Sequence, residues 1–178
     1  MVKRFHIREP IEFLFMVGSA WGILTLSAQL GLEYRLYLIW SIVLLAVFKT
    51  GYYFAETLWH LVEATAKDLA YHRFLILMAY NMAEVTLSYA LDFYCLHRLD
   101  NESFSGIPSD MNGGTLLFEC LYFSVLNFSF FGYGDITPSH IPAKIVMLLE
   151  VVTAFTTVIF LISDFVSMKD SMRKRQKP

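Results

Sequence analysis

The chain has 178 residues, of which 56% are hydrophobic and 17% are charged, whereas soluble domains have about 45–50% apolar and about 25% charged residues. With 16 Phe and 10 Tyr, the apolar side chains exceed what one small core can bury, so lipid must act as solvent for the rest. Disorder, collagen and a coiled coil are excluded, and the length allows one domain or one membrane bundle. The basic residues gather at the ends of apolar segments instead of forming a basic face, which argues against nucleic acid as a partner.

Four segments are long and apolar enough to cross about 30 Å of hydrocarbon as helices that rise about 1.5 Å per residue. They are predicted at residues 11–32, 36–55, 74–96 and 142–166. The first is too long for the apolar core of a signal peptide. Pro142 suits the first turn of the fourth helix, because its missing N–H would be unpaired there. The chain is therefore predicted to be an all-α, multi-pass membrane bundle.

Four spans place both termini on one side of the membrane, and the distribution of Lys and Arg decides which side that is. The side with the termini is expected to carry Lys3, Arg4, Arg8, Lys49, Lys67, Arg73, Lys169, Arg173, Lys174, Arg175 and Lys177. The opposite loops hold only Arg35, Arg98 and Lys144. Both termini are therefore predicted to be cytoplasmic. The protein itself is predicted to lie in the plasma membrane. The basic tail, residues 167–178, is also expected to attract anionic lipid.

Two polar segments connect the predicted spans. Residues 56–73 mix apolar and charged side chains, which predicts an amphipathic helix at the inner surface that can run on into the third span. Residues 98–114 are rich in Gly and polar residues and predict an external loop. The chain then divides into two peripheral helices with their connector (1–73), a second unit (74–166) and the basic tail.

A shorter apolar run, residues 116–131, is too short to span the membrane and is followed by Gly132, Tyr133, Gly134 and Asp135. We expect it to enter the membrane and return to the same face. Irregular backbone at that depth is tolerated where it lines a watery path, which indicates a pore. Both glycines can adopt the positive φ that turns successive carbonyls toward one axis. The tyrosine can brace the strand, and the carboxylate at the outer mouth attracts cations.

Residues 121–138 read LYFSVLNFSFFGYGDITP and are followed by Ala143-Lys144 and a long apolar helix. This pattern resembles the pore domain of the potassium channel family, as outer helix, pore helix, filter and inner helix over about residues 74–166. The resemblance implies a homotetramer around a central pathway. K⁺ is then the permeant ligand and no cofactor is needed. Its ligands would be the backbone carbonyls of Phe130, Phe131, Gly132 and Tyr133.

Three departures from the family pattern bear on function. Phe130 and Phe131 stand where the family usually has Thr and Val, and Ser129 would supply the missing hydroxyl only after a local shift. The fourth span has no Gly, with Ala154 near the usual hinge, and the first two spans lack the basic series of a voltage sensor. Two functions stay open: a K⁺-selective channel without a charged voltage sensor, or a channel-like protein that is non-selective, conducts poorly or does not conduct.

Further candidates for filter support or gating are Tyr122 and Phe123 in the predicted pore helix, Glu84 in the third span and Glu150 in the fourth. Glu84 shares one helix face with a polar stripe that is expected to face protein: Asn81, Ser88, Asp92 and Cys95. Acidic side chains at such depth are either proton-sensitive supports of the filter or of a helix interface, or protonated, hydrogen-bonded packing contacts. Both interpretations stay open. No motif for metal-dependent, nucleophilic or phosphate chemistry occurs in the sequence, so an enzyme is not expected.

Overall fold

The computed structural model describes residues 17–26, 32–67, 71–132 and 134–175, and helices make up most of them. A helix at Val17–Leu26 and a 3-10 turn η2 (Leu32–Tyr34) are followed by α2 (Arg35–Lys67), α3 (Tyr71–Leu99), α4 (Gly113–Phe128) and α5 (Ile141–Arg175). Two short strands, β1 (Phe104–Ser105) and β2 (Thr137–Pro138), pair in antiparallel register, with Phe104 opposite Pro138.

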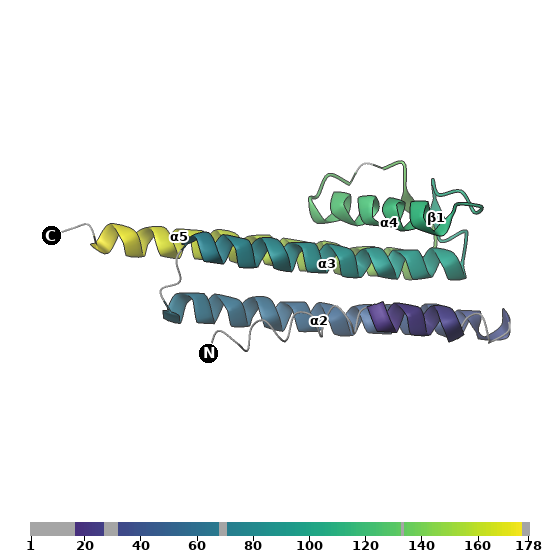
Figure 1. Cartoon of the computed structure of the whole chain (residues 1–178), viewed down its shortest axis with the longest axis horizontal. Coiled ribbons are helices and arrows are strands. Elements are labelled where there is room, and N and C mark those ends of the chain that lie inside the picture. Colours follow the sequence, from purple (N-terminus) through teal and green to yellow (C-terminus); the bar gives the residue numbers. More distant parts are fainter. Residues whose placement is uncertain (1–16, 27–31, 68–70, 133, 176–178) are drawn as a thin grey trace.

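The three long helices lie side by side along the long axis of the molecule (Figure 1). α2 and α3 are antiparallel, and α5 runs back along them, so α2 and α5 point the same way. α4 packs against α3 and α5 and covers only about half their length. We call the end where α3 stops and α5 starts the loop end of the bundle.

The path of the chain around α4 agrees with the predicted entry and return. α4 starts at the loop end and points toward the middle of the bundle, and the chain then turns back to the strands (Figure 1). β1 precedes α4 and β2 follows it, so their pairing holds both ends of this stretch together. The segment therefore enters and leaves at one end of the molecule.

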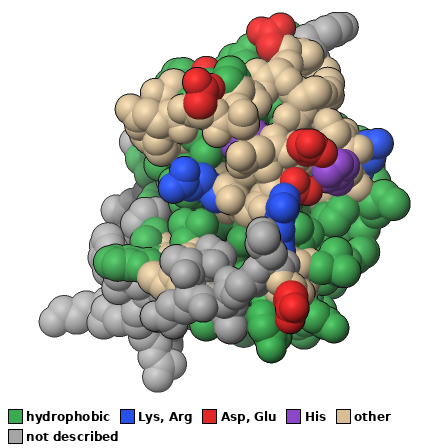
Figure 2. Space-filling view, turned by 90° about the vertical axis from the view of Figure 1, so that its right-hand side faces the viewer, with side chains coloured by type: hydrophobic (Ala, Val, Ile, Leu, Met, Phe, Trp, Pro, Cys, Tyr) green, Lys and Arg blue, Asp and Glu red, His purple; other side chains and the backbone are tan. Residues whose placement is uncertain are grey.

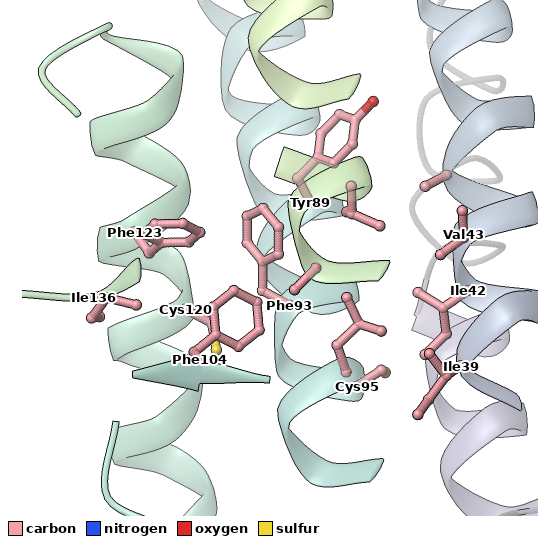
Figure 3. Close-up of a cluster of buried hydrophobic side chains, with 14 of the residues drawn as sticks. Ile39, Ile42, Val43, Tyr89, Phe93, Cys95, Phe104, Cys120, Phe123 and Ile136 are labelled. Carbon is pink, nitrogen blue, oxygen red and sulfur yellow. The ribbon is translucent and has the colours of Figure 1, made fainter. Parts of the chain in front are cut away.

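A cluster of buried apolar side chains joins all the helices (Figure 3). Its centre is a group of three rings, Phe93 on α3, Phe104 on β1 and Phe123 on α4, whose centroids lie 5.0 to 5.6 Å apart in edge-to-face geometry. Edge-to-face pairs are the favoured arrangement for aromatic rings. They fix α4 against α3 near the loop end.

Two of the described helices are long and apolar enough to cross a membrane, Arg35–Trp59 within α2 and Ile141–Ser163 within α5. The predicted span at 11–32 is described only at Val17–Leu26, and the spans at 11–32 and 74–96 stay predictions. Looking onto the loop end, Figure 2 shows charged side chains and histidines on this face and hydrophobic side chains on the flanks. Asp100 contributes to this face: it pairs with Arg35 of α2, and its Oδ2 lies 2.8 Å from His140 Nδ1.

The predicted second span and the helical part of its connector are continuous in the structure. Residues 36–55 and the connector from 56 onward form one helix as far as Lys67. The sequence has no Gly or Pro between Tyr52 and Lys67 that would stop a helix. α5 likewise continues beyond residue 166 to Arg175, so most of the predicted tail is helical.

Lys49 corrects one prediction. It was expected in the middle cytoplasmic loop, but it lies inside α2, where its Nζ is 2.5 Å from Asp92 Oδ2 on α3. The same ammonium donates to Ser88 Oγ at 2.8 Å. A charge can stay inside an apolar helix when a neighbouring helix supplies its partner. Lys49 therefore no longer counts toward the cytoplasmic excess of basic residues.

Candidate functional site

α4 positions the segment that carries the Gly-Tyr-Gly-Asp motif. Its first turn is capped by Asn112, whose side chain accepts the N–H of Gly114 at 2.8 Å, and such caps stabilise helix starts. The buried residues of α4 recur at helical spacing on one face: Leu116, Cys120, Phe123, Ser124 and Asn127. This face packs into the bundle and sets the direction in which α4 ends.

The end of α4 has the hydrogen bonds of a Schellman motif. Phe130 N–H donates to Asn127 O at 3.1 Å, and Phe131 N–H donates to Leu126 O at 3.0 Å. Phe130 takes the left-handed position of the motif with a φ of 60°, where Gly is usual. The Ser129 hydroxyl lies 2.8 Å from Val125 O, within its own helix. It therefore does not replace the missing threonine hydroxyl in this conformation.

In residues 130–132, here called the carbonyl segment, the backbone N–H groups all point the same way. Their three N–H groups all turn back onto the last turn of α4, since Gly132 N–H also reaches Leu126 O at 3.4 Å. Within the described part of the chain, no hydrogen bond uses the carbonyl oxygens of these residues. Three successive carbonyls are thus available to a cation or to water. Among the described residues, no group of three His, Cys, Asp or Glu is placed to hold a metal ion.

The positive φ predicted for Gly132 is confirmed, at 52°. Tyr133, predicted to brace the segment and to supply a carbonyl, lies outside the described residues. The prediction of a positive φ was wrong for Gly134, because its φ lies outside the left-handed region. Gly134 is exposed, but a Cβ there would lie 2.5 Å from Ile136 O. Asp135 is exposed just before β2.

The external loop contacts the chain directly after this motif, which the sequence did not reveal. Gly106 has a φ of 94°, and a Cβ on it would lie 1.7 Å from the carbonyl oxygen of Asp135. The hydroxyls of Ser105 and Thr137 are 2.7 Å apart, which adds a second contact beside the strand pairing. Sequence reasoning placed Gly106 in a loop; only its positive φ and this close approach show why a glycine is needed there.

Glu150 of α5 is completely buried, and its carboxyl group faces α4. One carboxyl oxygen is in hydrogen-bond contact with Ser124 Oγ, and the other accepts from Asn127 Nδ2 at 3.2 Å. Ser124 Oγ also donates to Thr86 O of α3 at 2.8 Å. We call these four residues the Glu150 cluster. The sequence singled out Glu150 but missed Ser124 and Asn127; their signal was two polar residues three apart on the same helix face as the apolar residues Cys120 and Phe123.

The polar stripe of α3 faces protein, as predicted. Asn81, Glu84, Ser88 and Cys95 are buried, and the Asp92 side chain is only 14% exposed. Tyr89, also on α3, has its hydroxyl 2.6 Å from Thr50 Oγ1 of α2 and 3.2 Å from Thr153 Oγ1 of α5. Polar contacts therefore link α2 to α3 and, through Tyr89, to α5.

The remaining candidates lie in different surroundings. Phe123 is buried in the aromatic cluster, whereas Tyr122 is exposed on the single chain. Ala154 is buried within the unbroken helix α5. The Phe130 ring packs edge-on against Phe155 of α5, with centroids 6.3 Å apart.

Comparison with known proteins gives one family match. The model of the family described as "Ion channel" matches residues 75–169, which is 95 of the 178 residues. No curated protein and no solved structure matches the chain. The matched stretch contains α4, the carbonyl segment and the loop that contacts it. Since more than half of the chain fits this family, the protein belongs to the ion channel family.

Proposed function

We propose that the protein is a potassium-selective channel in which four copies of the chain surround one central pathway. The observation that carries this proposal is the polarity of the carbonyl segment: every N–H turns onto α4, and no carbonyl oxygen has a hydrogen-bond partner among the described residues. Neutral carbonyl oxygens in series replace the hydration shell of a monovalent cation. One chain offers them from one side only, so several copies are needed to enclose an ion.

The surface around this segment supports assembly. Large apolar side chains are exposed in the single chain on α5, in the carbonyl segment and at the far end of α4: Leu148, Val152, Phe155, Phe131 and Phe118. Of these, Phe155 lies next to the carbonyl segment, because its ring packs against that of Phe130. Exposed apolar surface of this kind is covered by lipid or by another protein. We assign the part next to the carbonyls to neighbouring copies and the rest to lipid.

A charged voltage sensor is not part of this proposal. Arg35 and Lys49 are the Arg and Lys residues in the apolar part of α2, and each pairs with a carboxylate outside α2: Arg35 with Asp100, which follows α3, and Lys49 with Asp92 of α3. Two charges far apart along the helix, each paired with a carboxylate, do not form the repeated series that a membrane field moves. We further propose a multi-pass plasma-membrane protein with both termini cytoplasmic and with anionic lipid at the basic C-terminal segment.

A second candidate function is a channel-like protein that conducts poorly or without K⁺ selectivity. Phe130 favours it, because its ring is 48% exposed beside Phe155 and stands where the family supplies a hydroxyl. Four such rings at the inner end of a filter would form an apolar constriction, and constrictions of this kind stop ions by dewetting.

Ion flux into liposomes decides between the two. Purified protein is reconstituted and exposed to K⁺ or Na⁺ gradients, beside Phe130→Thr and the matched control Phe118→Thr, which changes a more exposed Phe at the other end of α4. K⁺ flux well above Na⁺ flux in the natural protein and in the control supports the potassium channel. Flux only in Phe130→Thr supports the second candidate.

The number of copies is measured on the same preparations by mass in detergent. A tetramer is expected for all three proteins. A stable monomer or dimer, together with silence in every flux assay, would contradict both candidate functions.

A further inference from the structure

Glu150 lies on the predicted inner helix, yet its carboxyl group points away from any open surface and into α4. We propose that Glu150 acts as a neutral carboxylic acid and is a positioning residue for ion selectivity, which it controls by fixing the last turn of α4. This inference rests on the proposed channel function and assigns a role to a residue that contacts no permeating ion.

Counting hydrogens shows why the neutral form fits. The Ser124 hydroxyl has a single hydrogen, and it donates to Thr86 O, which can only accept, at 2.8 Å. Its contact with Glu150 Oε1 is then a hydrogen bond only if the carboxyl carries a hydrogen and donates it to Ser124. The other carboxyl oxygen accepts from the Asn127 amide. A carboxylic acid, with one donor and one acceptor, turns all three contacts into hydrogen bonds, whereas a carboxylate satisfies only two of them.

The charges around the cluster are consistent with a neutral group. From α4, the carboxyl meets only uncharged side chains, Ser124 and Asn127. The charged groups that act on Glu150 are Asp92 of α3 and Lys49 of α2, which pair with each other. Tyr89 of α3 is engaged by Thr50 and Thr153. No cation therefore contacts Glu150 among the described residues, and an ionised carboxylate buried without a cation is strongly disfavoured.

Asn127 connects this cluster to the carbonyl segment. Its side chain donates to Glu150, while its backbone carbonyl accepts the N–H of Phe130 at 3.1 Å. The same residue therefore holds both the acid and the turn at which the carbonyl segment starts. Without Glu150, the buried amide of Asn127 and hydroxyl of Ser124 lose a partner, and unpaired buried polar groups drive local rearrangement.

The test uses two variants of Glu150 in the full-length protein. Glu150→Gln keeps the size and offers one donor to Ser124 and one acceptor to Asn127, so it should behave like the neutral acid. Glu150→Leu keeps a similar volume without polar atoms. Glu102→Gln, at an exposed position of the external loop, is the matched control. We expect the K⁺/Na⁺ permeability ratio to fall about tenfold or more in Glu150→Leu and to stay within about twofold in both Gln variants.

Two further readouts do not depend on conduction, so they distinguish failure of this inference from failure of the channel proposal. In infrared difference spectra, Glu150→Gln should lose intensity in the carbonyl band of protonated carboxylic acids relative to the natural protein, whereas Glu102→Gln should not. An unchanged band in Glu150→Gln overturns the inference. Hydrogen exchange should be faster at residues 126–132 in Glu150→Leu and unchanged in Glu150→Gln. The inference is overturned if the protonated-acid band is absent from the natural protein, if Glu150→Gln exchanges as fast as Glu150→Leu, or if Glu150→Leu matches the natural protein.

Discussion

Phe130 adopts a backbone conformation that its side chain disfavours. At a φ of 60°, an L-residue with a Cβ crowds the following carbonyl, which costs about 1–2 kcal/mol. Glycine avoids this cost, and β-branched residues such as threonine fit the region worst. Phe130→Thr therefore does more than restore a hydroxyl: it favours a different backbone conformation at the start of the carbonyl segment.

The strain at Phe130 predicts an unusual order of stability. Phe130→Gly and Phe130→Ala both remove the ring and its contact with Phe155, but only Gly relieves the positive φ. We expect the Gly variant to be more stable by about 1 kcal/mol, visible as a higher midpoint of thermal unfolding in detergent. Equal midpoints, or a more stable Ala variant, would show that Phe130 is not held in the left-handed region in solution.

Gly106 carries a second prediction at this scale. A methyl group there would collide with the carbonyl oxygen of Asp135 at 1.7 Å, at a φ of 94° that also disfavours alanine. Gly106→Ala should lower the thermal midpoint and reduce K⁺ selectivity, because the loop must move away from the end of the filter motif. Gly51→Ala is the control: its site has no atom within 4 Å of the added carbon, and alanine favours a helix. A selective and stable Gly106→Ala protein would contradict this contact.

Of the two positive φ angles in the carbonyl segment, only one could be predicted from the sequence. The positive φ of Gly132 could be predicted, because the glycine itself signals it. The positive φ of Phe130 could not, since nothing in a phenylalanine signals a Schellman motif. That motif depends on hydrogen bonds to Leu126 and Asn127, which follow from where α4 ends.

At the scale of elements, the pairing of α2 with α3 depends on Lys49 and Asp92. Their side chains are only 15% and 14% exposed, and the ammonium also donates to Ser88. Removing one partner leaves a nearly buried charge without compensation, which is far less favourable than removing both. The pair therefore acts as a unit.

This coupling predicts a non-additive mutant cycle. Lys49→Met and Asp92→Leu should each destabilise the protein by about 3–5 kcal/mol, whereas the double variant should recover most of the loss. Denaturant or thermal unfolding of the four proteins in one detergent measures the coupling. Additive losses would mean that the two side chains do not interact.

The error in placing Lys49 has a physical origin. In sequence, a lysine at the end of an apolar run indicates the edge of the membrane, because an unpaired charge is costly inside it. Its partner lies on the next helix and comes into range only once α2 and α3 pack. The helices and their approximate positions could be predicted from the local sequence pattern, but the contacts between helices could not.

At the scale of the whole molecule, the exposed Asp135 should set the potential at the outer mouth. Four copies would place four carboxylates around one pathway, where they concentrate cations. Asp135→Asn should lower single-channel K⁺ conductance roughly twofold or more in about 10 mM salt. In about 1 M salt, where the screening length is only about 3 Å, the difference should nearly vanish.

Asp110→Asn is the control for this effect, since it removes an exposed carboxylate of the external loop that is not part of the filter motif. It should leave conductance unchanged at both salt concentrations. An equal loss in both variants would indicate a diffuse surface charge, and no loss in Asp135→Asn would contradict its place at the mouth.

The entry and return of the chain around α4 could be predicted because the signals are local: an apolar run too short to span, then Gly-Tyr-Gly-Asp, then a long apolar helix. The contacts that hold this unit together are not local. Gly106 meets Asp135, and Glu150 meets Ser124 and Asn127, across stretches of chain whose approach only the folded bundle determines.

The unbroken course of α5 gives the molecule a mechanical property. Its 35 residues extend about 52 Å, well beyond the roughly 30 Å of hydrocarbon, and no Gly or Pro interrupts it between Ala143 and Arg175. A torque applied near Arg175 is therefore carried along the rod to Glu150, about 38 Å away, without a hinge to absorb it. In the proposed channel, a small rotation of the far end of α5 would therefore be transmitted to Glu150 and to the turn of α4 that it contacts.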